Sequence, residues 1–307
     1  MVTNKLLAAG FGVFSGLVLA MGSANAADVA STIFINELNQ WSDNSGEQLG
    51  VDDGDGVLEI GETLRGTFDI QTIEDITGPG GTTQYGTGGV NELSGIFEIV
   101  VTSVNVTNDP DGSFGGGVLN GDETVDYSFG AYAPFQVEFG LSGTTMVVFF
   151  DDPAADYSRT GTIANAETTA TGGTKVLEIG FTGDVDESWQ SEDTPSNVAG
   201  IDNATPGIAV GEFSFGLGIL VNSLFGGVTQ VGATCLPVCP GDGLVDINGS
   251  GSILGTGGLT SEYDAFNNVD LTFQPTSIPE PGSLGMLGAG LVGLGFFLRT
   301  RRQKQAA

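Results

Sequence analysis

The sequence of 307 residues contains no histidine. This absence removes the usual general base, the Ser-His and Cys-His nucleophile pairs, and the commonest side-chain ligand of transition metals. Chemistry by carboxylates alone survives, because glycosidases work with two acidic side chains. We therefore do not expect an enzyme, and the sequence assigns no catalytic residue.

Basic side chains are also scarce, with 8 Lys and Arg against 38 Asp and Glu. One basic residue lies in the N-terminal leader and four lie in the last nine residues, whereas Glu280 is the only acid outside 27–278. The central part, 27–278, therefore carries 37 acids against three cations, a net charge of −34. Such a charge repels nucleic acid and anionic lipid surfaces and attracts cations. The three cations are Arg65, Arg159 and Lys175.

Cysteine occurs twice, at Cys235 and Cys239. In an oxidising compartment such a pair is expected to form a small disulfide loop, whose entropic stabilisation is small because the loop is short. A two-thiol metal site is the alternative, and it lacks histidine or further cysteine partners.

The N-terminus has the pattern of a secretory signal peptide, 1–26. A single lysine precedes an apolar stretch, and Ala24 and Ala26 supply the small-x-small site that signal peptidase requires. Cleavage after Ala26 would leave Ala27 as the mature N-terminus. An uncleaved transmembrane anchor is the alternative, which the short apolar stretch disfavours.

The C-terminus combines three elements in order. Pro279-Glu280-Pro281 precedes a glycine-rich apolar run, 282–298, and a basic tail, 299–307, ends the chain. As a helix, the run would span about 25 Å, near the lower limit for crossing a bilayer. The positive-inside rule keeps the tail in the cytoplasm and the central domain in the periplasm. The basic stop consists of Arg299, Arg301, Arg302 and Lys304.

This three-part arrangement resembles the sorting tag of the PEP-CTERM proteins of Gram-negative bacteria. The resemblance implies recognition by an exosortase, a membrane-embedded cysteine transpeptidase that removes the membrane tail near the Pro-Glu-Pro. It also implies transient anchoring in the inner membrane and final placement on the cell surface or in the extracellular matrix. The tag covers about a tenth of the chain, so it implies a sorting class, and the family of the central domain is not identified.

Composition and pattern predict an all-β central domain, 27–274, built as a sandwich or jelly roll. The chain has 51 glycines, and those of the central domain have no fixed period and interrupt short β-branched runs, as turns do. A signal helix precedes this domain, and an extended proline-rich spacer, 275–281, joins it to one transmembrane helix. The expected strands are 31–37, 63–70, 95–107, 124–129, 135–141, 144–150, 174–182, 212–224, 227–231 and 269–274. The expected loops and irregular segments are 78–89, 153–173, 187–207 and 241–260.

The segment 51–62 partly matches the twelve-residue calcium loop. Position 1 carries Val51 where an aspartate is expected, although Asp52 is adjacent. Ca²⁺ binding is one interpretation, and an Asp- and Gly-rich turn between two strands is the other. The candidate ligands are Asp53, Asp55, the carbonyl of Val57 and Glu62.

Trp41 and Trp189 both lie in polar surroundings. Aromatic rings beside acids and amides can stack on sugars, whereas single aromatics that flank strands commonly cap a core. The sequence leaves both interpretations open.

Together these features favour an exported protein with a structural or adhesive role in exopolysaccharide, biofilm or floc formation. The expected partners are signal peptidase, the exosortase, the inner membrane and the exopolysaccharide matrix, without nucleic acid; Ca²⁺ is the one cofactor considered. The first alternative is a calcium-stabilised carbohydrate-binding module that uses Trp41 or Trp189. The second is a carboxylate-only glycosidase or lyase, which requires two acids that converge in a cleft, one with a raised pKa.

Overall fold

The structure is a computed structural model that describes residues 29–77, 82–84, 92–197, 209–235, 241–254 and 263–277. None of the helices formed by these residues is long and apolar enough to cross a bilayer. The predicted residues of both chain termini lie outside the described ranges. They are the cleavage residues Ala24, Ala26 and Ala27, and the tag residues Pro279, Glu280, Pro281, Arg299, Arg301, Arg302 and Lys304.

Strands account for most of the described chain, which confirms the all-β prediction. The strands are β1 (Asn39–Leu49), β2 (Thr63–Asp75), β3 (Thr82–Gln84), β4 (Glu92–Asn108), β5 (Thr124–Ala131), β6 (Thr145–Asp152), β7 (Thr174–Gly180), β8 (Ser188–Pro195), β9 (Ala209–Asn222), β10 (Gly227–Thr229), β11 (Val231–Gly232), β12 (Leu244–Val245), β13 (Ile247–Leu254) and β14 (Ala265–Ser277). The helices are η1 (Val29–Thr32), η2 (Ser113–Gly116), α1 (Ala133–Phe139) and α2 (Ile163–Ala170).

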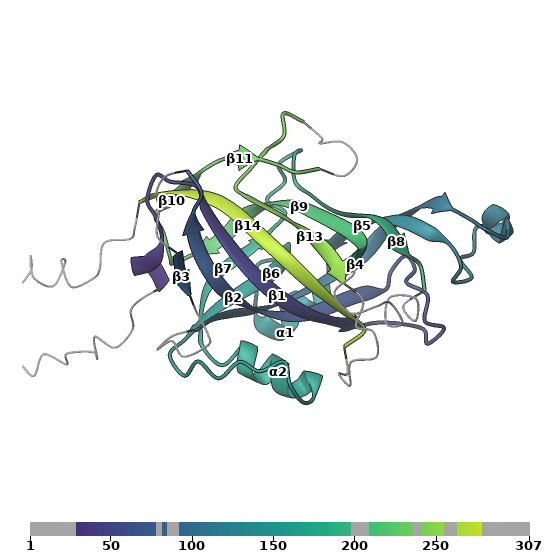
Figure 1. The fold of residues 1–307 in the computed structure, drawn as a ribbon, viewed down its shortest axis with the longest axis horizontal. Helices are drawn as coiled ribbons and strands as arrows, with labels where there is room; N and C mark the ends of the chain where they lie inside the picture. Colours follow the sequence, from purple (N-terminus) through teal and green to yellow (C-terminus); the bar gives the residue numbers. More distant parts are fainter. Residues whose placement is uncertain are drawn as a thin grey trace, which may run out of the picture.

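The main sheet has 12 antiparallel strands and closes on itself around one apolar core (Figure 1). Around the ring the order is β2, β1, β14, β13, β9, β7, β6 and β4, and β4 pairs with β2 again. Strands β5 and β8 widen the ring at one end, because β5 pairs with the second half of β4 and β8 pairs with β9. The result is sandwich-like, since opposing strands bury their inward side chains against each other.

The two α-helices pack on the outside of this sheet and are held there by one cation. Phe135 of α1 packs with apolar residues of β4 and β6. Arg65 of β2 donates hydrogen bonds to Glu98 of β4 (2.9 Å), to Glu138 of α1 (2.8 and 2.9 Å) and to Glu167 of α2 (2.6 and 3.3 Å). One guanidinium therefore neutralises acids from three other elements, which fits its rigid fork of donors.

Two segments predicted as strands are not strands. The segment 31–37 contains part of η1 and then turns at Asn36, whose φ of 61° breaks an extended chain. The segment 135–141 is mostly helix α1, with a proline in its first turn and Gly140 in the left-handed conformation as its C-cap. Local capping thus outweighs an apolar pattern that is also compatible with a strand.

Three long strands and helix α2 lie in segments predicted to be irregular or left unassigned, as do the short β3, β12 and η2. Strands β1, β8 and β13 are rich in polar residues and glycine, and they are strands because neighbours pair with them on both sides. Helix α2 begins after Thr162, whose side chain accepts a hydrogen bond from the backbone N–H of Asn165. Sheet pairing over long sequence separations overrides local preference here.

The first three residues of the predicted spacer, 275–277, belong to β14, and the rest of it lies outside the described residues. The carbonyl of Pro275 accepts from the N–H of Asn36 (2.7 Å), and that of Ser277 accepts from the N–H of Gly226 (2.7 Å). Strand β10 pairs with β14 as far as Ser277. Residues 275–277 are therefore part of the sheet.

Candidate functional site

A row of polar side chains on β1 points into the closed sheet. Because strand side chains alternate, Trp41, Asp43, Ser45 and Glu47 share the inner face. Their exposed fractions are 1%, 5%, 1% and 4%. Burying three polar side chains in a core is unfavourable unless they are hydrogen-bonded, so this row requires an explanation.

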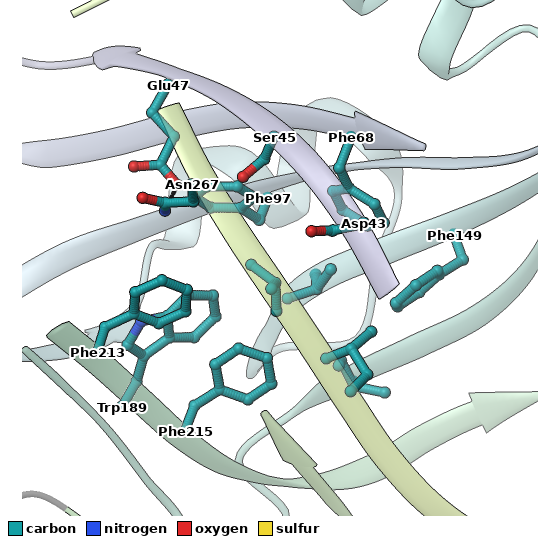
Figure 2. Close-up of a pocket in the computed structure, with 14 residues that line it drawn as sticks. Asp43, Ser45, Glu47, Phe68, Phe97, Phe149, Trp189, Phe213, Phe215 and Asn267 are labelled. Carbon is teal, nitrogen blue, oxygen red and sulfur yellow. Dashed lines mark hydrogen bonds between the residues drawn. The ribbon is translucent and has the colours of Figure 1, made fainter. Parts of the chain in front are cut away.

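Aromatic rings face this row across a small cavity (Figure 2). Trp189 of β8 packs against Phe215 of β9 with ring centroids 4.5 Å apart and planes tilted by 31°, and the ring centroid of Phe97 of β4 lies 5.8 Å from that of the same indole. The cavity has a volume of about 30 Å³. Space of that size accommodates one or two water molecules.

Few hydrogen bonds satisfy the polar row. Asn267 of β14 donates its side-chain N–H to Glu47. Within the described part of the chain, Oδ1 of Asp43, Oγ of Ser45 and Oδ1 of Asn267 are buried and have no hydrogen-bond partner. The interior thus combines apolar walls with several polar atoms that can still bind a small polar molecule.

Burial shifts the protonation of the interior acids. It raises the pKa of Glu47 to about 8. Burial, reinforced by the charge of Asp69, raises the pKa of Asp43 well above its ordinary value. Glu47 is therefore mostly a neutral carboxylic acid at pH 7, and burial favours the neutral form of Asp43 as well, because a low-dielectric interior does not stabilise a charge.

The interior acids meet the electrostatic condition for a glycosidase but not the steric one. A raised carboxyl pKa is what a general acid requires. Ligand pockets, however, usually measure several hundred Å³. The cavity of about 30 Å³ is too small for a sugar ring. The geometry around Asp43 and Glu47 therefore does not support the carboxylate-only glycosidase.

Both tryptophans are core residues. Trp41 packs edge-on against Phe149 and Phe273, with centroids 5.9 and 4.7 Å away. Trp189 lines the interior cavity and is 7% exposed. Neither indole presents a face to solvent, so neither can stack on a sugar in this conformation, and the core interpretation describes both.

The calcium-like segment forms an exposed loop between β1 and β2. Carboxylate oxygens of Asp52, Asp53 and Asp55 lie within 4.8 Å of one another. Glu62 does not join them: its two oxygens accept from the backbone N–H groups of Asp53 (3.0 Å) and Glu59 (2.8 Å). The backbone N–H of Val57 donates to Asp55 (2.8 Å). The fold thus brings Asp53 and Asp55 together, adds Asp52, and uses Glu62 to close the loop.

A second group of acids, which sequence reasoning missed, lies in the loop between β4 and β5. Carboxylate oxygens of Asp109, Asp111 and Asp122 also lie within 4.8 Å of one another. Partial desolvation and the charge of Asp111 raise the pKa of Asp122. The signal that could have found this group is the alternation of aspartates before Gly112, since Asp-x-Asp-Gly is common in loops that bind hard cations.

Both acidic loops lie at the same end of the molecule, at the right in Figure 1. Val57 forms a β-bridge with Asn197, and the adjacent Ser196 donates its N–H to the carbonyl of Glu123 (3.1 Å). The two loops are therefore tied to one short segment that follows β8. We call this region the acidic end, defined by Asp52, Asp53, Asp55, Asp109, Asp111 and Asp122.

The opposite end holds both ends of the described chain, at the left in Figure 1. The segment after η1 contacts β14, because Asn36 bonds to Pro275 and accepts from the side chain of Gln274 (2.9 Å). Ile76 also lies there, since its N–H donates to the carbonyl of Leu38 (3.1 Å). We call this region the terminal end, defined by Val29–Thr32, Asn36, Ile76, Gly227–Thr229 and the last residues of β14.

The predicted cysteine pair is only half within the described residues. Cys235 is disulfide-bonded. Cys239 lies outside the described ranges. The two-residue strands β11 and β12 pair beside Cys235, so the bond lies next to a short hairpin.

Comparison with known proteins identifies the C-terminal tag. The family model of the PEP-CTERM protein-sorting motif matches residues 277–302. The match starts at the last residue of β14, and it confirms the resemblance read from the sequence. No curated protein and no solved structure matches the chain. The motif marks an exported bacterial protein with membrane-anchored sorting and processing by an exosortase.

Proposed function

We propose that this exported protein has a structural or adhesive role on the cell surface or in the exopolysaccharide matrix of biofilms or flocs, and that it is not an enzyme. The observation that carries the proposal is the sorting motif on a domain with a large anionic surplus. Such a domain, placed outside the cell, attracts cations and can be joined through them to acidic polymers.

The few cations of the domain support this proposal because acids or aromatic rings already occupy them. Arg65 contacts three glutamates, and Nζ of Lys175 lies 2.7 Å from Glu178. The guanidinium of Arg159 lies over the ring of Phe266, 5.7 Å from its centroid. The remaining negative charge is left for ions and partners in the matrix, and the acidic end concentrates part of it in two loops.

A gene deletion tests this proposal. Removing the gene should reduce the resistance of the matrix to shear, and the full chain supplied in trans should restore it. A chain truncated after Ser277, which lacks the sorting motif, should be exported but should not restore cohesion. Unchanged cohesion after deletion would count against the structural role.

A calcium-stabilised carbohydrate-binding module is the second candidate, favoured by the two aspartate groups. Because both tryptophans are buried, contacts to sugars would come from the acidic end and not from indole stacking. The test is retention of the purified domain on immobilised matrix polysaccharide with and without Ca²⁺. Retention that requires Ca²⁺ and is lost in the Asp109→Ala, Asp111→Ala variant would favour this candidate.

A further inference from the structure

The polypeptide is fixed in the sheet up to the residue at which the sorting motif begins. Strand β14 runs to Ser277, where β10 still pairs with it, and the motif match starts at the same residue. The carbonyl of Ser277 is bonded to Gly226, so the exit point of the chain is held by the fold.

Covalent geometry limits how far this exit point can lie from the membrane. Five residue steps separate Ser277 from Gly282, where the apolar run begins. A fully extended chain covers at most about 3.6 Å per residue, so the distance is at most about 18 Å. Strand β14 has 13 residues, and at about 3.3 Å per residue it spans about 40 Å. The tether is thus short compared with the length of the domain.

We propose that, while the tag is anchored, the terminal end faces the lipid headgroups of the membrane and the acidic end points away from it. The short tether allows little reorientation, because a domain lying with its acidic end on the bilayer would require the exit point to rise well beyond 18 Å. The N-terminal side of the chain leaves from the same end, through the contact of Asn36 with Pro275, and does not oppose this orientation.

The distribution of exposed acids favours the same orientation. The acidic end groups six aspartates, whereas the acids beside Ile76 at the terminal end include Glu37, Glu74 and Asp75. Headgroup phosphates repel carboxylates, and the effect extends over a Debye length of about 8 Å at physiological ionic strength. The acidic end lies about 40 Å from the exit point along β14, beyond that range. At the terminal end, Ile76 is 44% exposed, so an apolar side chain is available next to the membrane surface. The proposed orientation also leaves the acidic end free for partners outside the cell.

Photo-cross-linking from two matched positions tests the orientation. Ile76 at the terminal end and Val51 at the acidic end are both 44% exposed. Each is replaced separately by a photo-reactive amino acid in the full chain, in host cells without exosortase activity so that the tag is retained. We expect phospholipid adducts from position 76 several-fold above those from position 51. Equal labelling, labelling from position 51 alone, or no lipid adduct from either position would overturn the orientation.

A second experiment tests the orientation by lengthening the tether. Twenty Gly and Ser residues inserted between Ser277 and Ile278 add an r.m.s. reach of about 25 Å. We expect the lipid adducts from position 76 to fall several-fold, while both proteins remain in the membrane fraction. Full labelling despite the linker would contradict the proposal that the short tether sets the orientation.

The proposed orientation depends on membrane anchoring of the motif and not on the adhesive role. Release of both proteins from membranes would therefore refute the anchoring, and the orientation with it, without touching the adhesive role.

Discussion

Acidic side chains of this protein occupy two contrasting environments. Asp43 and Glu47 lie in the core among aromatic rings, where burial raises their pKa and favours the neutral carboxylic acid. The aspartates of the acidic end are mostly exposed and grouped in threes. The same residue types thus act inside as neutral polar groups and outside as charge, and only the second set can attract cations from solution.

The largest expected effect comes from the interior, through pH. The folded-state pKa of Glu47, about 8, lies above its unfolded value, so the folded state holds a proton that the unfolded state releases. Stability from this group is fully present below the unfolded pKa and is lost as pH rises through the folded pKa. Between pH 5 and 8, the free energy of unfolding should fall by about 4 kcal/mol on this account. Urea denaturation at pH 5, 6.5 and 8 measures it.

A matched pair of variants isolates the contribution of Glu47. Glu47→Gln should flatten the pH dependence, because the amide cannot ionise. Glu74→Gln, a change at an exposed position on neighbouring β2, should leave the slope unchanged. A Glu47→Gln protein that keeps the wild-type slope would show that Glu47 does not titrate as a buried group.

The next largest effect concerns the acids on the outer face of the sheet. Arg65→Ala leaves the buried carboxylate of Glu98 without its cation and removes the links to α1 and α2. Loss of one partner from a buried pair costs about 3 kcal/mol. Lys175→Ala serves as the comparison, because it also leaves a buried carboxylate, that of Glu178, without its cation. That carboxylate keeps its hydrogen bonds from Ser142 and Thr145 and no link to a helix is lost, so the cost should be smaller, about 1 kcal/mol. Equal losses measured by urea denaturation would contradict the central role of Arg65.

These effects also show what the sequence could reveal. The apolar strand predicted at 95–107 lies within β4, and that predicted at 144–150 nearly coincides with β6. These strands are rich in β-branched and aromatic residues, which favour buried strands whatever their neighbours, so the local pattern was sufficient to predict them. Strand β1 could not be found this way, because Asp43, Ser45 and Glu47 on its inner face look like loop residues.

The candidate sites also divide into those that the local sequence defines and those that only the folded chain brings together. The sorting tag is a contiguous motif whose elements are defined by order and spacing, and the family model confirms it. The interior cavity depends on β1, β8, β9 and β14, which meet only in the folded chain. Asp53 and Asp55 were identified from spacing, whereas the turn of Glu62 toward backbone N–H groups depends on loop geometry that spacing does not encode.

The smallest expected effect concerns the exposed acids. If Ca²⁺ binds Asp53 and Asp55, excess chelator should lower the melting temperature of the wild type by roughly 5 °C, since a ligand that binds only the folded state stabilises it. The Asp53→Ala, Asp55→Ala variant should show no such shift. Asp109→Ala, Asp111→Ala is the matched control for the other loop. A shift of the same size in the Asp53→Ala, Asp55→Ala variant would place the bound ion elsewhere.

The intact mass of the protein recovered from the extracellular matrix of its own host decides between matrix placement and permanent anchoring. We expect a chain that starts at Ala27 and ends near Pro279, because the signal peptide and the membrane tail have both been removed. A chain that retains 282–307 and occurs only in membranes would contradict it. Such a result would indicate a permanently anchored protein, for which a binding or receptor-like role would replace the matrix role.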